Sequence, residues 1–141
     1  MMKRTYIDTN VLIDAFQGDD ETSRRAMEVL DDPHRILVVS DYLRLEVLPK
    51  PSFHKRQDEV EFMSAVLDNA GENVPPDQNV TETAINLASR YDIAPMDALH
   101  AGAAVTAGVD ELVTMEKPTN PLCRVKEVKV ISLHSSALKQ K

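Results

Sequence analysis

Apolar and polar positions fall along the chain in blocks that fit short strands followed by longer amphipathic helices. Continuous apolar runs rich in β-branched residues predict buried strands, and these runs are 5–7, 36–39, 112–114 and 128–131. Segments with apolar residues on one helical face predict helices, and these segments are 10–16, 21–30, 41–48, 57–70, 81–91 and 95–107. Strands that alternate with helices predict a three-layer α/β/α sandwich around a mainly parallel central sheet.

Residues at the ends of these segments support the boundaries. Ser40 can cap the N-terminus of the third helix, and Thr81 that of the fifth, because a hydroxyl accepts a free backbone amide proton. Pro49 is expected to end the third helix, since the residue before a proline avoids helical geometry. In the fifth helix the apolar positions, Ile85 among them, are expected to face the core.

The length of 141 residues fits a single domain, 1–141, with one hydrophobic core. Hydrophobic residues make up 43% and charged residues 28%, which is typical of a globular protein rather than a disordered chain. No apolar run approaches the roughly 20 residues that span a bilayer, and Asp8 interrupts any signal-peptide core. The single cysteine, Cys123, cannot form an internal disulfide, so we expect a cytoplasmic protein with no membrane partner.

The net charge of −7 argues against a non-specific nucleic-acid coat, because phosphate binding is driven by Lys and Arg. A local basic stretch nevertheless runs from Lys50 to Arg56. It fits equally well a solvated loop that leads into a helix and a segment that contacts phosphate.

Four acidic residues occupy positions where a carboxylate is either costly or specially placed. Asp8 follows the first strand, Glu116 follows the strand at 111–114, and Asp97 stands in the first turn of its helix. Glu46 interrupts an apolar helical pattern. Because the carboxyl ends of parallel strands meet at one sheet edge, these groups are expected to converge. Converging acids with no cluster of Lys or Arg beside them predict a hard divalent cation.

Each acid also has an interpretation without a metal. Asp8 could cap the helix that follows it, and Asp97 could interact with the dipole of its own helix. Glu46 could extend along the helix to solvent or pair with Arg44 or Lys50, and Glu116 could be a solvated loop residue. On the residues alone, the metal role is favoured for Asp8 and Asp97 and stays open for the other two.

His100 lies three residues after Asp97, so both side chains project from nearly the same helix face. His100 could orient Asp97, contact a substrate, or be hydrogen bonded within a helix interface. Asp14 is a second helix-borne neighbour of the acidic group. The four histidines and the one cysteine have no zinc-ligand spacing, and the four glycines form no phosphate-binding loop.

Four segments of the chain combine into a recognisable pattern. They are Asp8-Thr9-Asn10-Val11-Leu12-Ile13-Asp14, Glu46 in the helix after the second strand, Pro95-Met96-Asp97-Ala98-Leu99-His100-Ala101 and Leu112-Val113-Thr114-Met115-Glu116. In order and spacing they resemble a PIN domain, and most closely the small stand-alone PIN proteins of the VapC toxin type. The resemblance covers nearly the whole chain.

The resemblance implies a ribonuclease that depends on Mg²⁺ or Mn²⁺. It implies four catalytic and metal-binding acids, which are Asp8, Glu46, Asp97 and Glu116. It implies neutral polar residues that help to orient the acids or bound waters, which are Thr9, Asn10 and Thr114. His100 joins this supporting set from its place beside Asp97.

Toxins of this type cut RNA, pair with a small antitoxin whose tail blocks the groove, and dimerise. The resemblance therefore implies an RNA substrate, an antitoxin partner and a homodimer. We expect single-stranded or looped RNA, since an active site with metal ions reaches a phosphodiester best in unpaired strands. The basic residues that could line its approach are Arg44, Lys50, Lys55 and Arg56, with Arg24 and Arg25.

Glu116 departs from the pattern, in which the fourth acid is usually Asp, and the aromatic residue that often follows it is missing. A PIN-fold binding or scaffold module that does not cut RNA is therefore a second interpretation. A phosphohydrolase of the haloacid dehalogenase type, with Asp8 as nucleophile, is disfavoured because that family has an Asp where this chain has Asn10.

Overall fold

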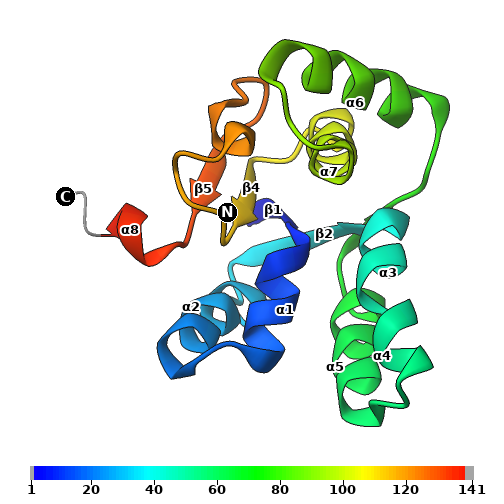
Figure 1. Ribbon diagram of the computed structural model, residues 1–141, viewed down its shortest axis with the longest axis vertical. Helices are drawn as coiled ribbons and strands as arrows, with labels where there is room; N and C mark the ends of the chain where they lie inside the picture. Colours follow the sequence, from blue (N-terminus) through cyan, green and yellow to red (C-terminus); the bar gives the residue numbers. More distant parts are fainter. Residues whose placement is uncertain (1, 139–141) are drawn as a thin grey trace.

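The computed structural model describes residues 2–138 and has a central sheet of five strands (Figure 1). All neighbouring strands are parallel, and their order across the sheet is β3-β2-β1-β4-β5. The strands are β1 (Lys3–Ile7), β2 (Arg35–Ser40), β3 (Glu72–Val74), β4 (Glu111–Thr114) and β5 (Val130–Ser132). The predicted α/β class with a parallel sheet is confirmed.

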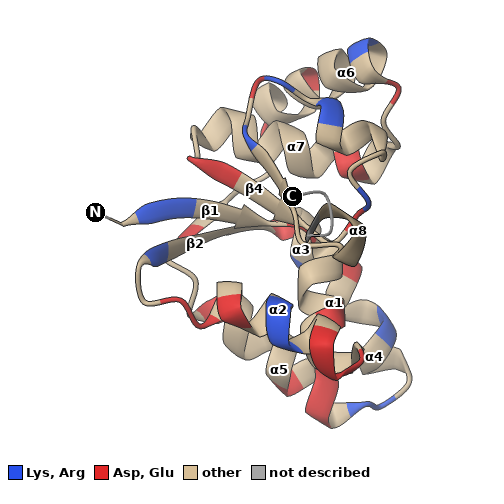
Figure 2. Cartoon of the chain, turned by 90° about the vertical axis from the view of Figure 1, so that its left-hand side faces the viewer, with Lys and Arg blue, Asp and Glu red and all other residues tan. Residues whose placement is uncertain are grey.

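Helices cover both faces of the sheet, which gives the three predicted layers. The helices are α1 (Thr9–Gln17), α2 (Asp20–Leu30), α3 (Asp41–Val47), α4 (Pro49–Phe53), α5 (Gln57–Asp68), α6 (Gln78–Tyr91), α7 (Pro95–Ala107), the 3₁₀ helix η1 (Pro121–Arg124) and α8 (Ser135–Leu138). Figures 1 and 2 show α6 and α7 on one face, with α1, α2 and α5 on the other. No helix in the described part of the chain is long and apolar enough to cross a membrane.

The strand order places a switch in winding direction beside β1. From β1 the chain moves outward through β2 to β3, and it then returns across the sheet to add β4 on the other side of β1. Because parallel connections are right-handed, the helices that precede this return and the helices α6 and α7 within it lie on opposite faces. The carboxyl ends of β1 and β4 therefore meet at the switch point where open α/β sheets commonly bind ligands.

Two of the three predicted helix boundaries are confirmed. Ser40 caps α3, since its Oγ accepts the N–H of Leu43 at 3.3 Å. α3 ends at Val47, as expected from Pro49, and Pro49 itself begins α4, because a proline in the first turn lacks only an N–H that has no helical partner anyway. The Asp77 carboxylate, not Thr81, caps α6 by accepting a backbone N–H at 2.9 Å. The first half of the basic stretch is therefore helical rather than a loop.

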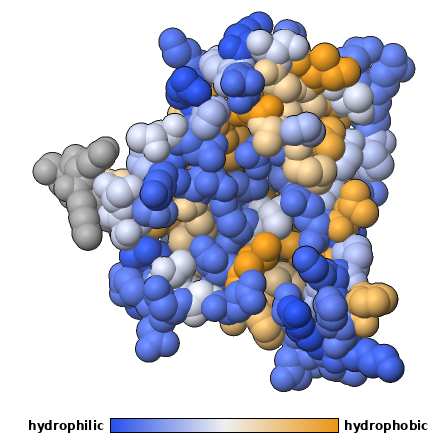
Figure 3. All heavy atoms as spheres, in the orientation of Figure 1, coloured by the Kyte–Doolittle hydropathy of each residue, from blue (hydrophilic) through white to orange (hydrophobic). Residues whose placement is uncertain are grey.

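The prediction that Ile85 faces the core is wrong. Its side chain is 62% exposed, and it lines a shallow groove of about 400 Å³ between α6 and α7. Figure 3 shows hydrophobic side chains gathered over these two helices. The two helices approach closely because Gly102 faces the backbone of α6, where an added Cβ would lie 2.9 Å from the Val80 carbonyl oxygen. The face of α6 that is turned to the core carries Val80, Ala84 and Leu87, and Ile85 lies outside it.

Candidate functional site

Asp8 lies at the carboxyl end of β1 and is 3% exposed. Its N–H continues the sheet by donating to the Val113 carbonyl of β4 at 2.9 Å. Its Oδ1 accepts the N–H of Thr9 at 2.9 Å, and its Oδ2 accepts the hydroxyl of Thr114 at 2.8 Å. The capping interpretation of Asp8 is thus correct, and the same bonds fix the carboxylate at the switch between β1 and β4.

Asn10 and Asn120 hold the carboxylate of Glu116 from two sides. Asn10 Nδ2 donates to Oε1 at 3.3 Å, and Asn120 Nδ2 donates to Oε2 at 3.1 Å. Asn10 is itself fixed, because its Oδ1 accepts the N–H of Met115 at 3.0 Å. The sequence reasoning missed Asn120, although an Asn before Pro121 is a helix-start signal four residues after Glu116. The longer Glu side chain is therefore accommodated by amide donors rather than left in solvent.

Glu46 projects from α3 to a pair of donors on other elements. Its Oε1 accepts the hydroxyl of Thr9 at 2.6 Å and a hydrogen bond from Nε2 of His100. The bond from His100 is the main cause that lowers the pKa of Glu46 below its usual range. Arg44, the alternative partner, instead donates to Asp68 Oδ1 at 3.0 Å.

His100 contacts Glu46 and not Asp97. The imidazole is 1% exposed, and its Nδ1 lies 2.8 Å from the hydroxyl of Tyr6 on β1. Among the described residues, no hydrogen bond joins His100 to Asp97. Of the three interpretations of His100, a histidine satisfied within an interface matches the structure, and the partner that it holds is the acid of α3.

Asp97 carries the least compensated charge of the four acids. No described residue donates a hydrogen bond to its carboxylate, which is half-buried in the first turn of α7. Burial raises its pKa to about 6, and the negative charges of Asp8, Glu116 and Glu46 add to the rise. The structure therefore brings all four predicted acids into one electrostatic group.

The donor set of this group fits a hard divalent cation held partly through water. Carboxylate oxygens are the ligands that Mg²⁺ and Mn²⁺ prefer. Within residues 2–138, no three His, Cys, Asp or Glu side chains lie close enough together to surround a metal by themselves. Mg²⁺ keeps several of its waters and is commonly bound through one or two carboxylates, so the separation is compatible with such a site.

The basic residues predicted for RNA binding line different clefts on the surface near the four acids. Lys50 and Arg56 line a cleft of about 130 Å³ together with Glu46. Lys55 lines a separate cleft beside Phe16. Lys50 and Arg56 are therefore the two that share a cleft with one of the four acids, Glu46.

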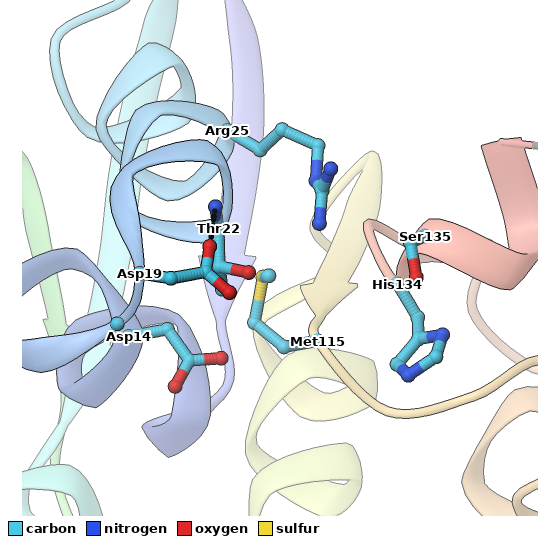
Figure 4. A pocket seen from close by; sticks show the side chains of 8 residues that line it. Asp14, Asp19, Thr22, Arg25, Met115, His134 and Ser135 are labelled. Carbon is cyan, nitrogen blue, oxygen red and sulfur yellow. Dashed lines mark hydrogen bonds between the residues drawn. The ribbon is translucent and has the colours of Figure 1, made fainter.

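Asp14 lines a different cleft, of about 330 Å³, with Asp19, Arg25 and His134 (Figure 4). Burial raises the pKa of Asp14 above its usual range. The cleft also includes Met115, which precedes Glu116, so it opens next to the acidic group without sharing any of the four acids.

An α/β fold with acids at the switch between β1 and β4 is the arrangement that the sequence motifs predict for a PIN domain. The family model described as PIN domain matches residues 5–118, and the chain belongs to the PIN domain family. The family predicted from the motifs is confirmed. No curated protein sequence shows a significant match to the chain.

Solved structures with the same fold share little sequence with the chain. A toxin-antitoxin complex from Klebsiella pneumoniae gives a TM-score of 0.69 at 22% identity, covering 91% of this chain and 96% of that one. VapBC2 from Rickettsia felis, bound to a fragment of promoter DNA, gives 0.68 at 15% identity, covering 92% and 98%. FitAcB from Neisseria gonorrhoeae gives 0.60 at 18% identity, covering 91% and 96%.

Proposed function

We propose that this chain is a ribonuclease that depends on Mg²⁺ or Mn²⁺ and is the toxin of a toxin-antitoxin pair. The observation that carries the proposal is the set of four carboxylates near the switch between β1 and β4, with the pKa of Asp97 raised to about 6. Lys and Arg form their ion pairs with other acids, as Arg4 does with Glu72 and Arg35 with Glu111. A cation is the natural group to balance the remaining charge.

In this proposal Asp8 and Asp97 are the main metal ligands, Glu46 holds a metal or its water, and Glu116 completes the site. When bound, the cation lowers the pKa of an attacking water and stabilises the leaving oxygen of the phosphodiester. Asp8 is fixed for this role by bonds to both of its oxygens. Hydrogen bonds of Asn10 to Thr114 and Met115 join the start of α1 to the end of β4, and so hold Asp8 and Glu116 in fixed positions relative to each other.

Lys50 and Arg56 support RNA as the substrate. They place positive charge in the cleft that contains Glu46, on an otherwise acidic protein. The proposed path of a single strand passes this cleft and reaches the four acids, where an unpaired phosphodiester is accessible. Arg44 and Lys55 stay predicted contacts of more distant nucleotides.

The proposed partner is a small antitoxin, because two of the structures with the same fold are named as a toxin-antitoxin complex and as VapBC2. Assembly as a homodimer and a cytoplasmic location are part of the same proposal. Coexpression with candidate antitoxins, followed by copurification, tests the partner independently of cleavage.

Cleavage of single-stranded RNA in Mn²⁺, compared between the wild type and Asp8→Asn, tests the activity. We expect the wild type to form products and Asp8→Asn to be at least about 100-fold slower, since a metal ligand is removed. Asp58→Asn, an exposed first-turn acid of α5, is the matched control and should retain wild-type activity. Equal product from the wild type and Asp8→Asn would refute the ribonuclease.

The second candidate is a PIN-fold module that binds without cutting. The observation that favours it is the fourth acid, Glu116, which is longer than the usual Asp and whose two oxygens are held by Asn10 and Asn120. An Asn120→Ala variant distinguishes the two. In a nuclease that needs Glu116 as a ligand, freeing its Oε2 should keep or raise the rate at saturating Mn²⁺, whereas a module that does not cut should stay inactive.

A further inference from the structure

A buried chain of polar groups joins the start of α3 to Glu46 near the end of the same helix. The N–H of Leu43 donates to Ser40 Oγ, which lies 2.6 Å from the hydroxyl of Tyr6. That hydroxyl lies 2.8 Å from Nδ1 of His100, whose Nε2 bonds to Glu46 Oε1. Ser40 and Tyr6 are fully buried, and His100 is 1% exposed. The chain crosses three secondary-structure elements before it returns to α3.

The chemistry of the four side chains indicates which group donates and which accepts in each hydrogen bond of this series. An ionised Glu46 only accepts, so the proton on the facing nitrogen of His100 is donated to it. In the neutral tautomer of His100 that carries its proton on Nε2, Nδ1 accepts a hydrogen bond from the hydroxyl of Tyr6. Burial raises the pKa of Tyr6, which keeps this hydroxyl protonated. Every member of the chain is then paired in the low-dielectric interior, which makes the geometry specific.

The second oxygen of Glu46 connects this series of buried hydrogen bonds to the protein surface. Thr9 and His100 both bond to Oε1. No described residue donates to Oε2, and the Glu46 side chain is 29% exposed whereas that of His100 is 1% exposed. One oxygen is therefore anchored while the other is available to a ligand.

We propose that Tyr6 and His100 are positioning residues that fix Glu46 so that its Oε2 is presented to the metal. The proposal rests on the proposed function, and in it Tyr6 and His100 both act through Glu46 of α3. A glutamate side chain has several rotatable bonds, and their freedom is lost on binding unless it is restricted beforehand. Anchoring Oε1 through a buried histidine restricts it in advance, as outer-shell partners do for metal ligands.

The test compares Tyr6→Phe, His100→Leu and His100→Gln with the wild type. Tyr91→Phe is the matched control, because it also removes a bonded hydroxyl, one that donates to Glu127 at 2.6 Å outside the chain. Two quantities are measured on folded protein: the Mn²⁺ dissociation constant, from the spin-resonance signal of free Mn²⁺, and kcat and KM for RNA cleavage. A merely structural role changes thermal stability but neither of these.

We expect Tyr6→Phe to weaken Mn²⁺ binding and lower kcat by about 10-fold, and His100→Leu by up to about 100-fold, with KM for RNA unchanged. His100→Gln should recover part of the loss, because an amide offers one donor and one acceptor, as the neutral imidazole does. If His100→Leu does not fold, Tyr6→Phe decides, since it keeps the ring that fills the core.

Two failures are distinguishable. If the wild type binds Mn²⁺ and cleaves RNA, but folded Tyr6→Phe matches Tyr91→Phe in both measurements, the positioning role is overturned and the ribonuclease stands. If the wild type neither binds Mn²⁺ nor cleaves RNA, the proposed function itself fails, and the positioning role fails with it.

Discussion

Asp97→Asn should stabilise the metal-free protein at neutral pH. The pKa of Asp97 is raised from its ordinary 3.8 to about 6, so the folded state holds its proton more tightly than the unfolded state does. Below pH 4 both states are protonated and Asp97 contributes nothing. Between pH 4 and 6 the unfolded state loses the proton first, so the stability of the folded state falls as pH rises. Above pH 6 the full penalty is present.

The size of the effect follows from that pKa. Each pKa step corresponds to 1.36 kcal/mol, so a rise of this size gives an upper limit of about 3 kcal/mol. Asp97 is only half-buried, and solvent screening lowers the penalty to about 1–2 kcal/mol. For a chain of this length the Asn variant should therefore melt roughly 3–8 °C higher at pH 7.5.

The assay is thermal unfolding in EDTA at pH 4 and at pH 7.5, for the wild type, Asp97→Asn and the exposed first-turn control Asp58→Asn. We expect Asp97→Asn to raise the melting temperature at pH 7.5 and not at pH 4. Adding Mn²⁺ should stabilise the wild type and reduce the difference, because the cation binds the folded state of the wild type better. A variant that melts no higher than the wild type at pH 7.5 would show that burial and the neighbouring acids do not penalise the charge of Asp97 as described.

Three further predictions concern packing and buried polar groups. Gly102→Ala should lower the free energy of unfolding in urea by about 1–3 kcal/mol, because its Cβ would lie 2.9 Å from the Val80 carbonyl oxygen. A free energy of unfolding equal to that of the wild type would contradict the close approach of α6 and α7. Thr114→Val should weaken Mn²⁺ binding in calorimetry by about 10-fold, since it removes the donor to Asp8 Oδ2 without changing the shape of β4; unchanged affinity would exclude that donor from the site. Glu111→Ala should lower the free energy of unfolding in urea by about 3 kcal/mol, because the carboxylate is 2% exposed, accepts the Thr5 hydroxyl and pairs with the guanidinium of Arg35. A loss below about 1 kcal/mol would argue against a coupled network of these groups.

Much of the fold could be predicted because its signals are local. The period of apolar residues shows where strands and helices occur, and Ser40 and Pro95 mark helix starts by their own chemistry. The failure at Ile85 has a different origin. An apolar helix position is buried only if a neighbouring element covers it. For Ile85 that neighbour would be α7, and the local pattern of α6 does not specify where α7 packs.

For the candidate site, the sequence by itself determined the acids and their elements. Asp8, Asp97 and Glu116 could be found because strand ends and helix starts are readable, and the motifs around them identify the PIN family. Only the tertiary structure decided which groups touch. It assigned His100 to Glu46, 54 residues away, and held Glu116 through an amide 106 residues away on α1. Hydrogen bonds require angles and distances that are set by packing of separate elements, and no residue pattern along one segment carries that information.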